Sequence, residues 1–358
     1  MNQQETLLDT IKNIPELIDL RLDNVDGIKE QLSGIKAKKI NVIASGTSFN
    51  AAKAIQTIAW KYYNIDLRLF YPNFFTNNFS KTNFEIDAPY LFISQGGKTI
   101  STIRSIELVN SLGGTTISLT EDLNTPVAEA SKISIEIGSL NERFLFRTAG
   151  YSLSVLTLYL IVLMISFNNK TLSEDDLLTK IESLKLLPNL VNKVIDQSEN
   201  WYEKNKSKLS DIKNIYIAAG SEIMSVSQEA EIKLMEMVPI QSNSFEVEEL
   251  IHGPQNVFDS SIAFLLLVNN ENDFNKAQAI DQFLKKEIKA FSQIITKENV
   301  ATDKEYVVLN SADNEVDALI FITFIQVVSY YLSIERNRDL TERLNSLIDK
   351  YFNKTVKE

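Results

Sequence analysis

The sequence predicts an α/β protein built from two similar units, each a parallel sheet covered by helices. Through the first half, short β-branched runs alternate with segments of helical period, and this alternation is typical of a parallel sheet with helices on both faces. The same order begins again after a polar, helical segment at 172–208. The strand-to-helix junction Ile43–Ser48 is also echoed at Ile217–Glu222, which favours two copies of one unit.

The individual elements follow from periodicity. We expect two acidic helices before the first strand. In the uncharged run 148–167, seven Ser, Thr and Tyr side chains favour a helix in the core or at a subunit interface over a membrane span. The predicted strands are 39–44, 67–71, 90–94, 115–119 and 133–137 in the first half, and 214–218, 262–268, 291–295 and 306–309 in the second. The predicted helices include 48–63, 100–112, 148–167 and 316–334.

Composition excludes several classes of function. Hydrophobic residues make up 44% of the 358 residues, so a large core is expected. The net charge of −11 argues against nucleic acid or an anionic membrane as a partner, because both need a basic face. With no cysteine and one histidine, we expect no disulfide and no metal site. The N-terminus lacks the pattern of a secretory signal, which predicts a cytoplasmic protein.

Two turns suit an anion. Ser45–Ser48 follows the first strand and Ser94–Thr99 follows the third, and both combine glycines with hydroxyl side chains where helix N-termini offer free N–H groups. Neither is a dinucleotide fingerprint or a Walker loop, so no nucleotide cofactor is expected. The alternative is that Ser45 and Ser94 only cap helices.

A carboxylate and the single imidazole form a candidate acid/base pair. His252 stands before Gly253-Pro254, sixteen residues after Glu236 on a segment that predicts an amphipathic helix. Histidine titrates near neutrality and can exchange a proton with a carboxylate. The alternative is that His252 is a helix-end residue stabilised by the helix dipole.

Together these motifs resemble the sugar isomerase (SIS) domain family, in its double-domain branch of aminotransferase isomerase halves and fructosamine-6-phosphate deglycases. The branch has C-G-T-S and S-Q-S-G-E-T turns, then E-G-A-L-K-L-K-E and E-L-K-H-G-P, matched here by Ser45–Ser48, Ser94–Thr99, Glu229–Glu236 and Glu249–Pro254. The resemblance implies two tandem SIS domains, each a flavodoxin-like five-stranded parallel sheet flanked by helices. The implied divisions are N-terminal helices 1–38, SIS domains 39–170 and 211–338, a helical bridge 171–210, and a C-terminal helix and tail 339–358.

The resemblance also implies roles for residues. Glu236 would move a proton between C1 and C2 of the sugar, and His252 would act as an acid, in the neighbouring subunit's site of a homodimer or dimer of dimers. Arg147, beside the pocket, would bind a substrate carboxylate, or else pair with Glu142. Lys354 matches the lysine of a closing tail, against the alternative of a solvated terminal lysine, and Glu229 matches a second glutamate. Substrate contacts are expected from Gly46, Thr47, Ser48, Ser94, Gln95, Gly96, Lys98 and Thr99, where Gly96 replaces a serine and Lys98 a glutamate.

The function implied is a deglycase that cleaves a fructosamine-type sugar 6-phosphate into sugar phosphate and amine by Glu/His acid–base catalysis, without a cofactor. No glutaminase domain precedes the sugar domains in the sequence, so we expect no glutamine hydrolysis by this chain. An amino sugar phosphate deaminase or isomerase would share the same residues. A non-catalytic phosphosugar sensor is a third hypothesis, which the absence of a basic recognition helix disfavours.

Overall fold

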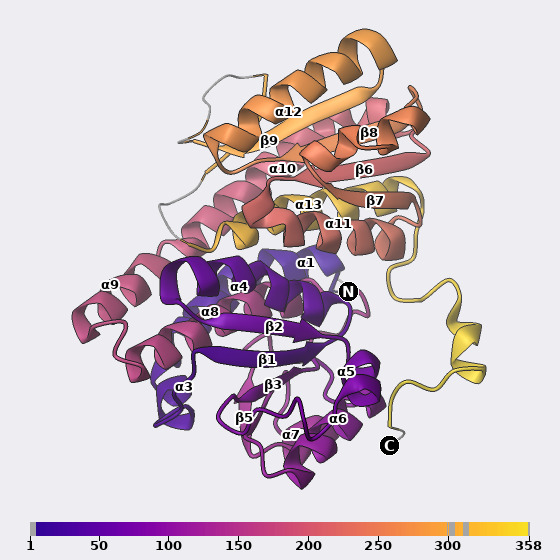
Figure 1. The fold of residues 1–358 in the computed structure, drawn as a ribbon. Helices are drawn as coiled ribbons and strands as arrows, with labels where there is room; N and C mark the ends of the chain where they lie inside the picture. Colours follow the sequence, from indigo (N-terminus) through magenta and orange to yellow (C-terminus); the bar gives the residue numbers. More distant parts are fainter. Residues whose placement is uncertain (1–4, 299, 301–304, 311–314, 357–358) are drawn as a thin grey trace. The chain divides into compact units, whose positions relative to one another are not determined.

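The computed structural model describes residues 5–298, 300, 305–310 and 315–356 (Figure 1). The chain divides into two compact units. We call them the N-sheet unit, residues 16–143, 149–185 and 342–358, and the C-sheet unit, residues 1–15, 144–148 and 186–341. This division differs from the expected boundaries. Packing divides the N-terminal helices, the helical bridge at 171–210 and the C-terminal segment between the two units, so none of the three is a separate part.

The N-sheet unit holds five parallel strands in the order β2-β1-β3-β4-β5. The predicted strands are confirmed to within one or two residues at each end. Helices α4 (Thr47–Tyr63) and α8 (Ala149–Asn168) pack on one face, and the short helices α5 (Pro72–Asn78) and α7 (Pro126–Ala130) flank α6 (Ile100–Ser111) on the other (Figure 1). The strands are β1 (Lys39–Ala44), β2 (Asp66–Phe70), β3 (Tyr90–Ile93), β4 (Thr116–Thr120) and β5 (Ile133–Glu136).

The C-sheet unit repeats this topology in the order β10-β9-β8-β6-β7, again with parallel pairing. The sequence analysis did not predict β7 (Gln241–Glu246), because its residues QSNSFE are mostly polar and it lies at an edge of the sheet. The other strands are β6 (Asn214–Ala219), β8 (Ile262–Leu267), β9 (Phe291–Lys297) and β10 (Val307–Leu309). The helices are α1 (Leu7–Lys12), α10 (Leu187–Leu209), α11 (Met224–Met237), α12 (Glu271–Phe283) and α13 (Asp317–Glu335).

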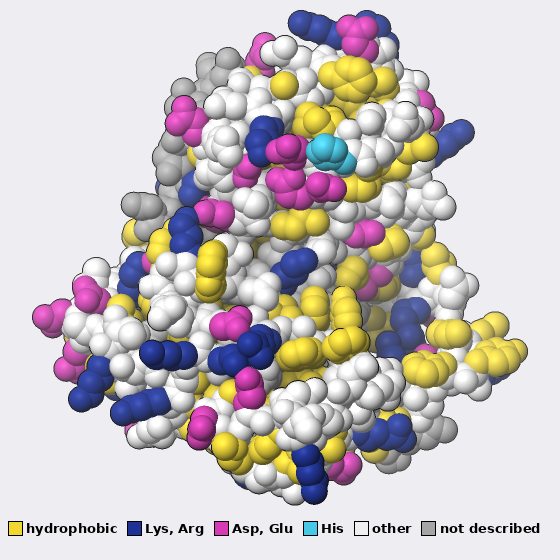
Figure 2. All heavy atoms as spheres, in the orientation of Figure 1, with side chains coloured by type: hydrophobic (Ala, Val, Ile, Leu, Met, Phe, Trp, Pro, Cys, Tyr) yellow, Lys and Arg dark blue, Asp and Glu magenta, His cyan; other side chains and the backbone are white. Residues whose placement is uncertain are grey.

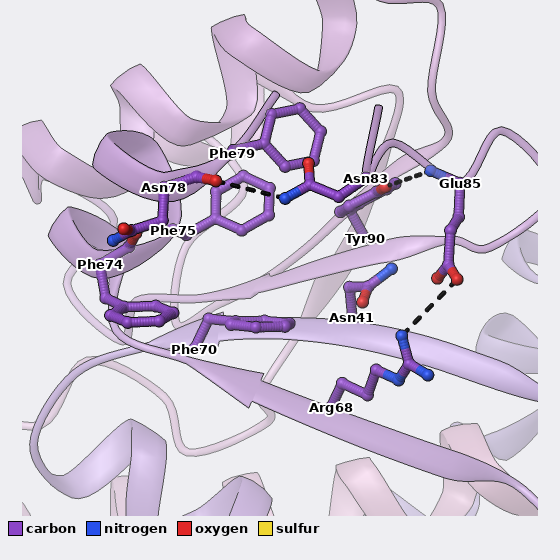
Figure 3. A pocket seen from close by; sticks show the side chains of 10 residues that line it. All are labelled: Asn41, Arg68, Phe70, Phe74, Phe75, Asn78, Phe79, Asn83, Glu85 and Tyr90. Carbon is purple, nitrogen blue, oxygen red and sulfur yellow. Dashed lines mark hydrogen bonds and ion pairs between the residues drawn. The ribbon is translucent and has the colours of Figure 1, made fainter. Parts of the chain in front are cut away.

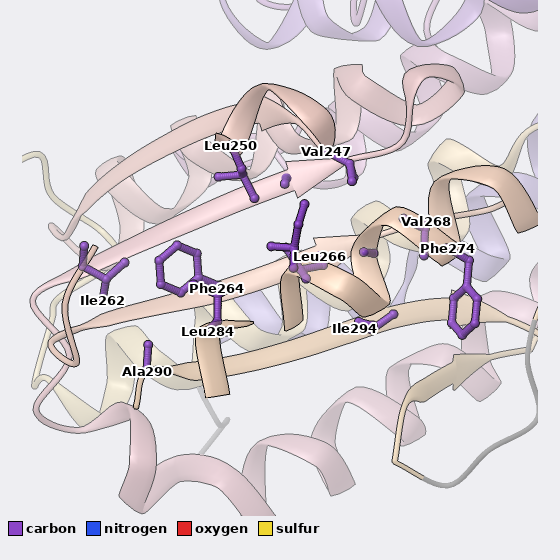
Figure 4. Packing of buried hydrophobic residues seen from close by; sticks show 13 residues of the cluster. Val247, Leu250, Ile262, Phe264, Leu266, Val268, Phe274, Leu284, Ala290 and Ile294 are labelled. Carbon is purple, nitrogen blue, oxygen red and sulfur yellow. The ribbon is translucent and has the colours of Figure 1, made fainter. Parts of the chain in front are cut away.

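The core of the C-sheet unit shows why the central strand is apolar throughout. All six residues of β8 are buried, and alternate ones, such as Phe264 and Leu266, pack with Phe274 and Ile280 of α12 (Figure 4). A strand covered on both faces needs a continuous apolar run. The strand predicted at 262–268 is confirmed, and the structure places it at the centre of the sheet.

Helices α8 and α13 are long and apolar enough to cross a membrane by length and composition alone, but 94% and 83% of their apolar windows are buried inside the protein. Each is apolar on all sides and packs against neighbouring helices of its own unit, α4 for α8 and α10 for α13. Both are thus core helices, as expected for 148–167.

The chain ends differ from prediction. Before β1 the structure has three helices rather than two: α1, α2 (Ile14–Asp23) and α3 (Val25–Gln31). Helix α9 (Glu174–Leu184) follows α8 in the N-sheet unit. In place of a C-terminal α-helix there is one 3-10 turn, Ser346–Lys350, in which Leu347 and Ile348 remain exposed. With few buried contacts, this segment has little to stabilise a longer helix.

Candidate functional site

The two anion-type turns lie side by side at the carboxyl edge of the N-sheet. Strands β1 and β3 are hydrogen-bonded neighbours, and their last residues, Ala44 and Ile93, are paired in register. The turn 45–48 that leads into α4 and the turn 94–99 that leads into α6 therefore leave adjacent strands at the same edge. This is where parallel α/β sheets bind their ligands.

Neither serine caps its helix. Gly46, at φ 55°, occupies the N-cap position of α4, and Thr99 occupies that of α6; neither N-cap makes a side-chain capping bond. Ser94 Oγ instead shares a hydrogen bond with Thr99 Oγ1 at 3.0 Å. The alternative that Ser45 and Ser94 only cap helices is therefore wrong, and the hydroxyl groups of Ser94 and Thr99 are held together at the start of α6.

The turn before α6 requires glycine at position 97. Gly97 has φ 62°, and a Cβ there would lie 2.1 Å from Thr125 Oγ1. Its N–H donates to Ser94 O at 2.9 Å, and its carbonyl accepts from Val127 N at 2.9 Å. This close packing fixes the path of the backbone past Gly96 and Lys98, both of which are half-buried.

Gln95 is held by the protein itself. Its amide nitrogen donates to Glu121 and Glu142, at 3.1 Å each, and the side chain is buried. Glu142 in turn accepts the N–H groups of Ala149 and Gly150 at the start of α8. A Cβ on Gly150 would lie 2.0 Å from the Gln95 amide, so only glycine fits here. The amide therefore positions the turn, and its contact with substrate stays a prediction.

Glu121 and Glu142 were not among the predicted site residues. They lie 26 and 47 residues from Gln95 in sequence, and no local motif points to them.

The C-terminal tail reaches the same turn. Ile100 N–H donates to Lys354 O at 3.1 Å, and Val356 N–H donates to Lys98 O at 2.9 Å. Thr99 and Thr355 form an antiparallel bridge between these bonds. The structure thus places Lys354 beside the predicted phosphate turn through its backbone, with its side chain exposed.

In the C-sheet unit, α11 carries a buried ionic cluster. Lys233 contacts Glu229 Oε1 at 3.1 Å and forms a shorter ion pair with Glu236. Glu229 and Lys233 are fully buried, whereas 30% of the Glu236 side chain is exposed. Burial disfavours the charge of Lys233, but the carboxylates of Glu229 and Glu236 outweigh it and raise the pKa of Lys233 to about 12. Glu236 is therefore the one member of the cluster that an external molecule reaches.

Lys233 was quoted within the Glu229–Glu236 motif but was not predicted as a site residue. Lys233 lies four residues after Glu229 and three residues before Glu236. Residues at these spacings share one face of a helix, so the spacing was the sequence signal for this cluster.

His252 lies at the surface of the C-sheet unit. It follows a 3-10 turn, Glu248–Ile251, and precedes Gly253, whose φ of 124° ends the turn. Figure 2 shows the single histidine exposed beside acidic side chains. Lys276, through its hydrogen bond, and more weakly His252 lower the pKa of Glu248. Within the described part of the chain, no hydrogen bond or ion pair joins His252 to Glu236.

Arg147 is half-buried in the C-sheet unit, one residue before Thr148, whose carbonyl accepts from Gln326 Nε2 at 3.0 Å. Whether it binds substrate stays a prediction.

No group of three or more Asp, Glu or His suited to a metal occurs among the residues the structure describes.

Comparison with known protein families gives a match within the first half of the chain. The family model that matches residues 35–169 is that of the SIS domain. The matched range includes both anion-type turns and Glu142, and the motif-based resemblance is thereby confirmed.

Curated relatives are similar over nearly the whole chain. The glutamine–fructose-6-phosphate aminotransferase [isomerizing] of Caldanaerobacter subterraneus subsp. tengcongensis is 22% identical over 96% of this chain, and that of Fusobacterium nucleatum subsp. nucleatum is 25% identical over 95%. The aligned parts cover 55% and 57% of those proteins, so the chain spans little more than half of their length.

Solved structures share the fold. A candidate phosphosugar isomerase of Clostridium difficile 630 superposes with a TM-score of 0.90 at 23% identity, over 99% of this chain and all of the other. The C-terminal domain of glucosamine-fructose-6-phosphate aminotransferase from Francisella tularensis gives 0.84 at 17% identity, over 95% and 98%. The prediction of two parallel five-stranded sheets flanked by helices, in a SIS-type arrangement, is confirmed.

Proposed function

We propose that this chain is a phosphosugar-processing enzyme, and specifically a deglycase that splits a ketoamine sugar 6-phosphate into a sugar phosphate and a free amine. The observation that carries the proposal is the partly exposed carboxylate of Glu236, held by a fully buried lysine at the end of α11. A carboxylate held in one position, with access to an external molecule, is what proton transfer on a bound sugar requires.

The substrate phosphate is assigned to the N-sheet edge. There Ser94, Thr99 and the turn around Gly97 gather hydroxyl groups and backbone N–H groups at the start of α6, and Lys98 adds a cation. Arg147 is assigned to a carboxylate on the amine part of the substrate. The tail residue Lys354 is assigned to the cover of this edge. The hydrogen bond from Ile100 N–H to the Lys354 carbonyl and the bridge between Thr99 and Thr355 support this assignment.

The reaction needs only proton transfers and water. After ring opening, Glu236 would remove a proton from C1 of the ketoamine and return it to C2, while the proton on nitrogen passes to the C2 oxygen. The C2 ketone thereby becomes an alcohol and the C1–N bond an imine. Water then adds to C1 and the amine leaves, with His252 supplying its proton. No cofactor is required by this sequence of steps, in which every electron pair stays within the substrate and the attacking water.

A second candidate is an aldose–ketose isomerase or amino sugar phosphate deaminase. The curated relatives carry "isomerizing" in their names, and isomerisation would use the same C1/C2 proton transfer. A phosphosugar sensor would bind the same ligands without turnover.

Product analysis tests these proposals. The full chain is incubated separately with a fructosamine 6-phosphate formed from an amino acid, with glucosamine 6-phosphate and with fructose 6-phosphate. Release of the amino acid supports the deglycase, release of ammonia supports the deaminase, and aldose formation alone supports the isomerase. Tight binding of these compounds with no product from any of them would favour the sensor and contradict the enzymatic proposal.

We also propose a homodimer in which His252 serves the partner's site, because its imidazole is exposed and makes no contact with Glu236 in its own chain. Mixing two inactive variants, Glu236→Gln and His252→Ala, after dissociation and reassociation should restore part of the activity, since mixed dimers hold one complete site. A mixture that stays inactive, although mixed dimers are detected, would place both groups in one subunit.

A further inference from the structure

A cavity of about 230 Å³ lies in the N-sheet unit, against the face of the sheet that α5 covers. Figure 3 shows Phe70, Phe74 and Phe75 on one side of it and Asn41, Arg68 and Glu85 on the other. The lining residues are Phe70, Phe74, Phe75, Phe79 and Tyr90, with Asn41, Arg68, Asn78, Asn83 and Glu85.

The strand register shows that this cavity is separate from the anion-type turns. Arg68, Asn41 and Tyr90 are paired across β2, β1 and β3, so they form one row on the same face of the sheet. The row lies three residues before the ends of β1 and β3, which at 3.3 Å per residue is about 10 Å from the carboxyl edge. In this row the side chain of Arg68 is 45% exposed, whereas Asn41 and Tyr90 are buried.

The aromatic side offers flat surfaces. The Phe70 ring lies 6.3 Å from that of Phe74 and 5.8 Å from that of Phe75, measured between centroids. Phe75 is buried, whereas 57% of Phe74 is exposed. An exposed phenylalanine beside a cavity lined by other rings provides a surface on which a planar molecule can stack.

The polar side offers donors and acceptors of mixed kind. Asn41 is 95% buried in β1, next to the apolar residues Ile40 and Val42. Glu85 accepts a hydrogen bond from Lys39 and lies 3.6 Å from Arg68. Burial raises the pKa of Tyr90, whose oxygen accepts the N–H of Glu85, so the phenol keeps its proton as a donor. Cationic and anionic groups balance here, which suits a neutral polar group.

We propose that this cavity binds a single planar aromatic ring that carries a neutral hydrogen-bonding edge of the carboxamide type. A cavity of about 150 Å³ holds a benzene-sized molecule, and 230 Å³ leaves room for one such substituent. The ring stacks against Phe70 and Phe74, and the substituent meets Asn41 and Tyr90. This ligand site goes beyond the proposed function and does not depend on it.

Benzamide is the probe that tests the proposal, in ligand-observed NMR titrations of the full chain. We expect saturable binding, and binding of cyclohexanecarboxamide weaker by about three- to tenfold, because it keeps the amide and lacks the flat ring. Absence of saturable benzamide binding, or equal affinity for both compounds, would overturn the proposal.

Variants locate the site. Asn78→Trp fills the cavity from the exposed end of α5 and should weaken benzamide binding by about tenfold or more, whereas Asn77→Trp, whose residue does not line the cavity, should leave it unchanged. Asn41→Leu removes the buried amide at similar volume and should cost about three- to tenfold. Melting curves confirm that each variant is folded. Unchanged binding in Asn78→Trp would place benzamide elsewhere and refute the assignment.

Discussion

The carboxyl edges of the two sheets have the same topology, but they differ in whether side chains cap the helices that begin there. At the N-sheet edge, α4 and α6 begin at Gly46 and Thr99 without a side-chain cap. At the C-sheet edge, Asn270 caps α12 by accepting the N–H of Asp273, and the Asp273 carboxylate accepts the N–H of Ser221. A carboxylate of the protein thus occupies the position where an external anion would bind.

A second charged group, the ion pair of Asp317 and Lys297, lies at the C-sheet edge. Asp317, at the start of α13, accepts hydrogen bonds from Lys297 at 2.7 Å and from Asn269 at 3.0 Å, and all three are buried. Repetition of a fold therefore does not repeat its ligand site. What separates the two edges is whether side chains of the protein satisfy the helix N-termini, and this difference supports the proposal that the anion binds at the N-sheet edge.

The largest effect is expected from Glu236→Gln, which should lower kcat by about 10²- to 10⁴-fold. The amide cannot carry the proton, while the anion-type turns are untouched, so the affinity for sugar phosphate should change little. Steady-state kinetics and a binding titration separate the two quantities. Glu231→Gln on the same helix is the matched control, because an amide oxygen can still accept the hydrogen bond of Ser244. Equal losses in both variants would remove Glu236 from its assigned role.

Lys233→Met should lower the free energy of unfolding by about 3–5 kcal/mol, since it leaves the buried carboxylate of Glu229 and the partly exposed one of Glu236 without their cation. Denaturant titration measures this, and Lys206→Met, which breaks a solvent-exposed pair with Glu203, should have a far smaller effect because water screens that pair.

The pH dependence of the Lys233 cluster has a definite sign. Because the pKa of Lys233 is raised to about 12, its contribution is fully present below the ordinary lysine value of about 10.4 and is lost as pH rises through the folded value. The difference between the wild type and Lys233→Met should therefore be constant from about pH 6 to 9. A difference that falls within that range would contradict the ion-paired cluster.

Two tightly packed glycines, one at each edge, give the next prediction. Gly97→Ala places a Cβ 2.1 Å from Thr125 at a positive φ, and Gly220→Ala places one 2.5 Å from Asp273. Each should destabilise the protein by about 1–3 kcal/mol, but only Gly97→Ala should weaken sugar phosphate binding, by about tenfold or more. Thermal unfolding and calorimetric titration measure the two effects. Similar losses of binding in both variants would contradict the division between the edges.

The sequence predicted the parts of this comparison that depend on local pattern. The apolar run 262–268 identified a central strand, and the turns at 45–48 and 94–99 were placed together because alternating strands and helices imply a parallel sheet. Polar β7 had no such signal. The contacts of Gln95 with Glu142 and of Ser221 with Asp273 join residues 47 and 52 positions apart, so only the folded chain shows them.

The smallest effects come from single side chains at the two edges. Thr99→Val removes a hydroxyl that is held beside Ser94 and should weaken sugar phosphate binding by about tenfold, the contribution of one hydrogen bond to a charged group. Asn270→Ala removes the cap of α12 and should cost about 1 kcal/mol of stability without a change in binding.

These last two variants test the cause of the difference rather than its location. If an internal cap is what keeps the C-sheet edge from binding anions, Asn270→Ala combined with Asp273→Ala should free the N–H groups of Ser221 and of the start of α12, and weak phosphate binding should appear there. Phosphate titration followed by NMR of backbone amides near Ser221 reports on this directly. Amide signals that stay unshifted at high phosphate would show that the buried pair of Lys297 and Asp317, and not the cap, closes this edge.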